Sequence, residues 1–67
     1  MNHHDRMNAA AALQLADDEW QRQLEATFGR AAGDARYDER GRGEPGTPLR
    51  RAYDDREVAR LAWEAAR

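Results

Sequence analysis

Apolar residues in the first half of the chain recur at intervals of three and four residues. The recurring positions are Leu13, Ala16, Trp20, Leu24, Phe28 and Ala31. On a helix of 3.6 residues per turn they fall within one arc, which is typical of an amphipathic helix with one buried stripe. Asn8 can cap the start of this helix, and Gly33 can end it. We therefore predict a helix over residues 9–32, preceded by a disordered tail at residues 1–7.

One acidic residue disturbs this pattern. Asp17 projects close to the apolar stripe at Trp20 if the helix is continuous. The alternative is that Asp17 or Asp18 caps a new helix, because the residues that follow resemble a capping box. Residues 8–16 would then be a separate or disordered piece. We favour the continuous helix.

The middle of the chain holds the strongest cluster of helix breakers. Its members are Gly33, Gly41, Gly43, Pro45, Gly46 and Pro48. Within the cluster, residues 34–40 are good helix formers, and they can make one or two turns before Gly41. The sequence therefore predicts a short third turn at 34–40 and a Gly/Pro-rich connection at 41–48.

A second long helix is predicted to follow this connection. Thr47 suits the N-cap position, and Pro48 suits the first helical position. A second capping signal begins at Asp54, so a helix that starts at residue 54 is the alternative. We favour one continuous helix from residue 48, because the whole stretch has good helix propensity and lacks glycine.

The second helix carries apolar residues on two sides. One side is formed by Val58, Leu61, Ala62, Ala65 and Ala66. Leu49 and Tyr53 point in nearly the opposite direction. Two helices joined by a compact connection pack antiparallel, so we predict an all-α antiparallel helical hairpin as one domain over residues 8–67. A lone hairpin leaves one apolar side uncovered, which favours either a homodimer that forms a four-helix bundle or a foreign partner.

Composition supports this fold class and limits the core. Of the 67 residues, 27 are apolar, but 14 of these are alanine, which contributes little when it is buried. Each large apolar side chain contributes roughly 1.5–3 kcal/mol on burial, so a few of them must carry the core. The β-branched residues are only Thr27, Thr47 and Val58. A chain so poor in strand-forming residues is expected to be helical.

The residue types present argue against catalysis and cofactors. The chain has no Cys and no Ser, which removes disulfides, thiolate zinc sites and the usual nucleophiles. Its carboxylates cluster where helices begin, and capping explains them there. His3 and His4 could chelate Cu(II) together with the amino terminus, but we interpret them as solvated side chains. We therefore expect no enzyme activity, no metal and no cofactor.

Charge and hydropathy give no reason to expect a membrane or a nucleic-acid partner. The formal net charge is −2, and no apolar run approaches the ~18 residues of a membrane span. We expect a cytoplasmic protein. The segment 36–43, rich in Arg and Gly around Tyr37, is the type of sequence that can clamp RNA phosphates and stack on bases. Its acidic neighbours favour a solvated loop instead.

Binding of a partner protein is the leading hypothesis. Trp, Tyr and Arg dominate binding hot spots, and the candidate residues of these types are Trp20, Arg36, Tyr37, Arg40, Arg42, Tyr53 and Trp63. We predict a small helical interaction module, a regulator or inhibitor, with a composition typical of bacterial or phage proteins. The alternative is a nucleic-acid-binding accessory protein that uses residues 36–43.

Overall fold

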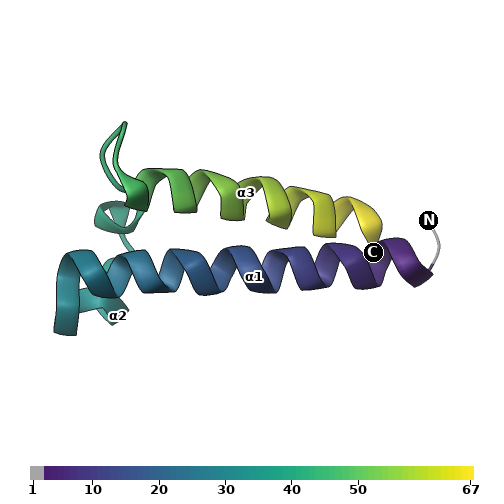
Figure 1. Ribbon diagram of the computed structural model, residues 1–67, viewed down its shortest axis with the longest axis horizontal. Helices are drawn as coiled ribbons and strands as arrows, with labels where there is room; N and C mark the ends of the chain where they lie inside the picture. Colours follow the sequence, from purple (N-terminus) through teal and green to yellow (C-terminus); the bar gives the residue numbers. More distant parts are fainter. Residues whose placement is uncertain (1–2) are drawn as a thin grey trace.

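The protein folds as a helical hairpin. The computed structural model describes residues 3–67, with side chains from residue 4 onward. Two long helices, α1 (His3–Phe28) and α3 (Pro48–Ala66), lie side by side in antiparallel orientation, and the short elements lie at the turn between them (Figure 1). No strand occurs in residues 3–67, which confirms the predicted all-α hairpin.

The hairpin is a single layer of two helices. It measures 39 × 21 × 16 Å, and its radius of gyration is 12.9 Å. A compact domain of this length would have a radius of gyration of about 11 Å. Each long helix therefore packs along one face only, and apolar residues such as Leu15 and Val58 on the outer faces remain exposed.

Helix α1 begins earlier than the sequence predicted. Residues 3–7, which we predicted to be a disordered tail, are helical, and residues 1–2 lie outside the described part of the chain. Asp5 in the first turn favours this start, because negative charge stabilises the amino-terminal end of a helix. The helix is continuous through Asp17 and Asp18, so the alternative break does not occur there.

Helix α1 also ends earlier than predicted, because Gly29 ends it in place of Gly33. Gly29 has a φ of +56°, the left-handed conformation that glycine adopts after the last turn of a helix. A 3₁₀ turn, η1 (Gly29–Ala31), and a short helix, α2 (Ala32–Ala35), follow it. They bring the chain back against α1, so the predicted helical end at residue 32 is wrong.

The extra turn predicted at residues 34–40 forms as two shorter pieces. Helix α2 covers its beginning, and a second 3₁₀ turn, η2 (Glu39–Arg42), covers its end. Asp38 caps η2, since its carboxylate accepts a hydrogen bond from the backbone N–H of Arg40 at 2.9 Å. The predicted connection at 41–48 therefore starts inside an ordered turn rather than in a loop.

Helix α3 is continuous from Pro48, as predicted. The hydroxyl oxygen of Thr47 accepts a hydrogen bond from the backbone N–H of Arg50 at 3.1 Å, which satisfies one of the free donors at the helix start. The alternative start at residue 54 does not occur.

The hydrophobic core lies at the turn end of the hairpin. It consists of Trp20, Leu24, Ala32, Ala35, Leu49 and Ala52, with Phe28 and Tyr53 packed against it. The apolar stripe predicted for α1 is therefore the buried one. Of the two apolar sides predicted for α3, the side of Leu49 faces α1, whereas Val58 and Leu61 are 69% and 57% exposed.

Candidate protein-binding site

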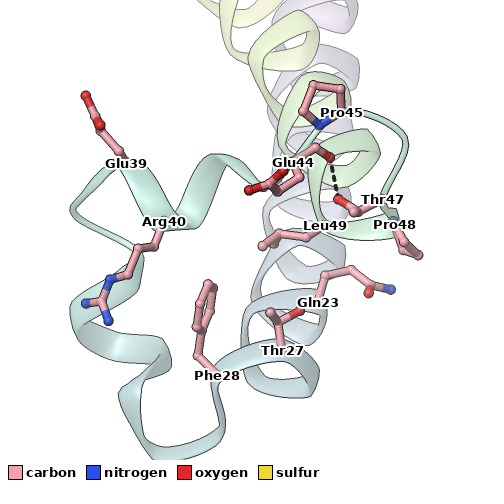
Figure 2. Close-up of a pocket in the computed structure, with 11 residues that line it drawn as sticks. Gln23, Thr27, Phe28, Glu39, Arg40, Glu44, Pro45, Thr47, Pro48 and Leu49 are labelled. Atoms are coloured by element: carbon pink, nitrogen blue, oxygen red, sulfur yellow. Dashed lines mark hydrogen bonds between the residues drawn. The ribbon is translucent and has the colours of Figure 1, made fainter.

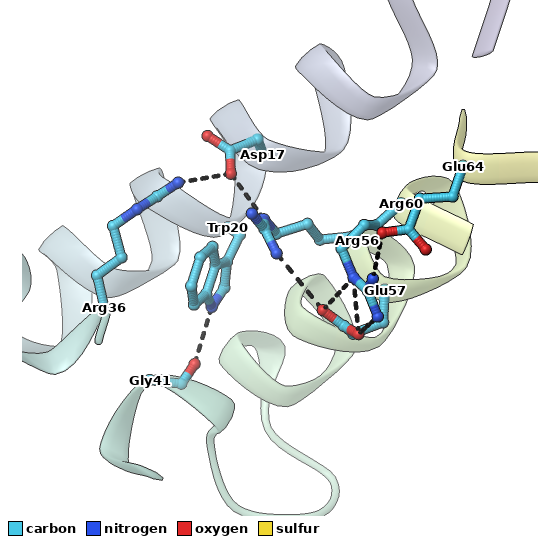
Figure 3. A network of polar contacts seen from close by, with 8 residues as sticks. All are labelled: Asp17, Trp20, Arg36, Gly41, Arg56, Glu57, Arg60 and Glu64. Carbon is cyan, nitrogen blue, oxygen red and sulfur yellow. Dashed lines mark hydrogen bonds and ion pairs between the residues drawn. The ribbon is translucent and has the colours of Figure 1, made fainter. Parts of the chain in front are cut away.

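Trp20 is the centre of a polar and aromatic cluster at the turn. Its side chain is buried, and its indole N–H donates a hydrogen bond to the carbonyl oxygen of Gly41 at 2.8 Å. The guanidinium groups of Arg36 and Arg56 lie 4.7 and 4.9 Å from the ring centroid. Figure 3 shows the indole between these two arginines. Cation–π contacts and a satisfied N–H thus accompany the burial of the largest side chain.

Asp17 joins the two arginines. Its Oδ1 atom accepts hydrogen bonds of 2.7 Å from both Arg36 and Arg56 (Figure 3). Burial alone would raise the pKa of Asp17, but these bonds from Arg56 and Arg36 outweigh it and lower the pKa below its ordinary value. The acidic residue that disturbed the apolar pattern therefore has a structural role. We call Asp17, Trp20, Arg36 and Arg56 the tryptophan clamp.

A row of ion pairs continues from the clamp along α3. Arg56 contacts Glu57 at 3.4 Å, and Arg60 bridges Glu57 and Glu64 at 2.9 Å each (Figure 3). The hydrogen bond from Arg60 is the main reason that the pKa of Glu57 is lowered. Partly exposed pairs of this kind are worth little individually. Through these pairs, the charges of Arg56, Glu57, Arg60 and Glu64 are balanced by neighbouring groups of the same chain.

Five of the seven predicted binding residues line one pocket beside the clamp. The pocket has a volume of about 380 Å³, and the five are Trp20, Arg36, Tyr37, Arg42 and Tyr53. Three of them contribute to the fold, because Trp20 and Arg36 belong to the clamp and Tyr53 packs edge-on against Trp20 with ring centroids 5.9 Å apart. Tyr37 and Arg42 are exposed.

Trp63 lies apart from the other predicted residues. It lines a shallow hollow of about 320 Å³ between α1 and α3, towards the end of the hairpin where the chain termini lie. The guanidinium of Arg67 lies 4.9 Å from its ring centroid. Trp63 is half-buried, so it contributes to the packing of the two helices as well as to the surface.

A groove larger than the pocket beside the clamp and the hollow at Trp63 opens at the turn end of the hairpin. It has a volume of about 730 Å³ and is built from the end of α1, η2, the loop and the start of α3. Its lining residues are Gln23, Thr27, Phe28, Glu39, Arg40, Gly43, Glu44, Pro45, Thr47, Pro48 and Leu49. Figure 2 shows Phe28 and Leu49 pointing into the groove from different elements. We call it the turn-end groove.

The turn-end groove has an apolar floor and a charged edge. Arg40, the predicted binding residue that lines it, lies over the ring of Phe28 at 5.8 Å. Its guanidinium is also paired with Asp38 at 2.8 Å. The hydrogen bond from Arg40 lowers the pKa of Asp38 below its ordinary value. The arginine charge is thus balanced by a neighbour of its own turn.

Sequence reasoning missed the groove because its apolar residues lie on separate segments. Phe28 was assigned to the buried stripe of the first helix and Leu49 to one of the two apolar sides of the second, and the segment around Pro45 and Pro48 was interpreted as a connection. The signal present in the sequence was the placement of Pro45 shortly before a helix whose first two residues are Pro48 and Leu49. Proline is rigid and apolar, so it can form the wall of a site.

Neither metal-binding nor membrane-spanning features occur in the described residues. Residues 3–67 contain no group of three or more His, Asp or Glu side chains that could hold a metal ion. The copper chelate considered for the amino terminus involves residues 1–2, which lie outside the described part. No helix in residues 3–67 is long and apolar enough to cross a membrane.

Comparison with known proteins gives no relative from which a role could be proposed. The chain matches no protein family model, no curated protein and no solved structure.

Proposed function

We propose that this protein is a small helical protein–protein interaction module that docks a partner through the turn-end groove. The observation that carries the proposal is an apolar groove of about 730 Å³ whose floor is formed by Phe28 and Leu49 at the turn. Its volume lies within the range of about 300–1,000 Å³ that is typical of small-molecule sites, so it can accept a side chain of a partner.

The walls of the groove are fixed before any partner binds. Thr47 caps α3 and also donates its hydroxyl hydrogen to the carbonyl oxygen of Glu44 at 2.7 Å, which holds the loop beside Pro45 (Figure 2). Asp38 caps η2, and Trp20 holds the carbonyl of Gly41 in that turn. A preorganised site loses little conformational entropy on binding, which favours affinity.

The alternative function, nucleic-acid binding through residues 36–43, receives less support. Arg36 is paired with Asp17, and Arg40 is paired with Asp38. Phosphate contacts would have to compete with both carboxylates. A gel-shift assay at low salt tests this alternative, which requires binding that weakens steeply as salt is added.

The outer face of α3 supports self-association as a second candidate role. Val58 and Leu61 are largely exposed there and lie on the side of the helix that faces away from α1. Burial of this face in a four-helix dimer would remove it from water. Light scattering tests this candidate: a Val58→Glu substitution should convert a dimer into a monomer, and a monomeric wild type would contradict it.

The docking proposal is tested by selecting displayed random peptides on the immobilised protein. Thr27 is exposed and lines the groove, so Thr27→Arg should fill the groove without disturbing the core. Ala26, the exposed neighbour outside the groove, gives the matched control Ala26→Arg. We expect selected peptides to lose binding to the Thr27→Arg variant and to keep it for the control. Failure to select any peptide that distinguishes the two variants would contradict the proposal.

A further inference from the structure

We infer that the segment that occupies the turn-end groove belongs to a foreign protein and carries one large apolar side chain flanked by Arg or Lys. This inference rests on the docking function proposed above and specifies the chemistry of the partner. It follows from the distribution of charge around the groove, from the groove's apolar floor, and from the charges beside the apolar residue that a second copy could insert.

The unbalanced charge at the groove is negative. Glu39 and Glu44 both line it and are exposed, and neither forms an ion pair with an arginine of the described residues. The single cation among the lining residues, Arg40, is held by Asp38. A basic group that approaches the groove therefore meets two available carboxylates, and an acidic group meets repulsion. Opposite potentials of this kind select partners and speed their association.

The two carboxylates lie on different segments at the edge of the groove. Glu44 comes from the loop that precedes α3 and points over the groove, whereas Glu39 comes from η2 and points outward at the outer edge (Figure 2). A side chain inserted against Phe28 and Leu49 places the next residues of its own chain near Glu44, and residues further along that chain can reach Glu39. Arginine in such a flanking position can form two parallel hydrogen bonds with one carboxylate. The predicted recognition element is therefore an apolar anchor with basic neighbours.

A second copy of this chain is a less suitable occupant. Its Arg6–Met7 pair, at the other end of α1, offers an exposed basic residue beside an exposed apolar one. Met7 has a single basic neighbour, Arg6, with Asp5 beside it and the uncharged Asn8 on its other side. A second copy therefore brings one cation and one further carboxylate to the acidic edge of the groove. A foreign segment with basic residues on both sides of its anchor complements that edge more fully.

The test uses three fluorescently labelled synthetic peptides and the full chain. Each peptide has a central Trp between two Ala residues, flanked on both sides by Arg, by Gln or by Glu, with Gly-Ser ends. We expect fluorescence anisotropy to show that the Arg peptide binds about fivefold or more tightly than the Gln peptide at low salt, and the Glu peptide most weakly. The advantage of the Arg peptide should shrink in high salt.

Charge reversal on the protein completes the test. The double variant Glu39→Lys/Glu44→Lys should reverse the order, so that the Glu peptide binds most tightly. The Thr27→Arg variant should bind none of the three peptides, whereas Ala26→Arg should bind all of them as the wild type does. Circular dichroism spectra establish that the variants remain folded.

The outcomes separate this inference from the docking function. If the three peptides bind with equal affinity, or if the double variant does not change their order, the inference of a basic partner is overturned. If those peptides still lose binding to the Thr27→Arg variant, the groove remains the docking site. If the peptides bind to the Thr27→Arg variant as tightly as to the wild type, the groove is not the docking site. If light scattering shows that the molar mass rises with protein concentration, and Thr27→Arg abolishes this rise, the occupant is a second copy. That outcome would overturn the inference of a foreign partner.

Discussion

The tryptophan clamp and the turn-end groove lie at the same end of the hairpin but differ in how their groups are satisfied. In the clamp, Asp17 receives two arginine hydrogen bonds and the indole N–H of Trp20 has an acceptor. In the groove, apolar side chains face an open space, and Glu39 and Glu44 have no arginine partner in the described residues. Groups that satisfy one another hold the fold together, whereas groups left available can serve a partner.

The sharpest test of this difference is removal of the indole at the centre of the clamp. Trp20→Ala should destabilise the protein by about 3–5 kcal/mol, because it leaves a cavity in the core and removes the hydrogen bond to Gly41. In a domain this small, such a loss approaches the total stability. Thermal melts followed by circular dichroism measure it. Tyr37→Ala, at an 84% exposed site, is the control and should shift stability by less than about 0.5 kcal/mol.

The second test removes the charge that joins the two arginines of the clamp. Asp17→Asn should cost about 1–2 kcal/mol, less than the loss from a fully buried pair, because the Asp17 side chain is 27% exposed. Asp18→Asn is the control, since Asp18 is exposed and its carboxylate accepts a hydrogen bond from the neighbouring Gln14 rather than from an arginine. Equal effects of the two substitutions in urea denaturation would show that the clamp charge does not stabilise the fold.

The same residue sets an expected dependence of stability on pH. The native pKa of Asp17 lies below its ordinary value of 3.8, so the unfolded chain binds this proton more tightly than the folded protein does. Its stabilising contribution is complete above the ordinary pKa and is lost as the pH falls through the lower native pKa. Urea titrations at pH 6 and pH 3 should show a smaller decrease in unfolding free energy for Asp17→Asn than for the wild type.

The third test compares two glycines that differ in their surroundings. A Cβ at Gly41 would overlap the backbone carbonyl of Ala35, whereas a Cβ at Gly33 would meet nothing within 4 Å. Gly41→Ala should therefore destabilise the protein by about 1–3 kcal/mol through overpacking. Gly33→Ala should stabilise it by about 0.5–1 kcal/mol, because Gly33 lies in α2 and alanine is the better helix former. Thermal melts that show the same sign for both would contradict this placement of η2.

Local signals in the sequence were sufficient for the start of α3 and for the buried stripe of α1. Thr47 determines the helix start by accepting a hydrogen bond from the backbone N–H of Arg50, three positions away, and Pro48 favours it through its fixed φ. The end of α1 was not predictable in this way. Gly29 and Gly33 are equally able to end a helix, and the choice depends on how Ala32 and Ala35 pack against Trp20.

The clamp and the groove could not be predicted from local patterns. The clamp joins Asp17 to Arg56, which lies 39 positions further along the chain. Asp17 in the apolar stripe was interpreted only as a possible helix start, and none of the eleven arginines was distinguished by its spacing as a partner for it. The groove is likewise formed by the end of α1, η2, the loop and the start of α3, and only Arg40 among its lining residues was predicted to bind.

The smallest expected effect concerns the acidic edge of the groove. The double substitution Glu39→Gln/Glu44→Gln should change the unfolding free energy by less than about 0.5 kcal/mol, because both side chains are exposed and lack arginine partners in the described residues. Asp38→Asn is the contrasting variant, since Asp38 caps η2 and pairs with Arg40, and it should lower the melting temperature. A clear loss of stability in the double variant would assign Glu39 and Glu44 to the fold. They would then be engaged within the fold like the clamp residues, and the groove would offer no free carboxylates to a basic partner.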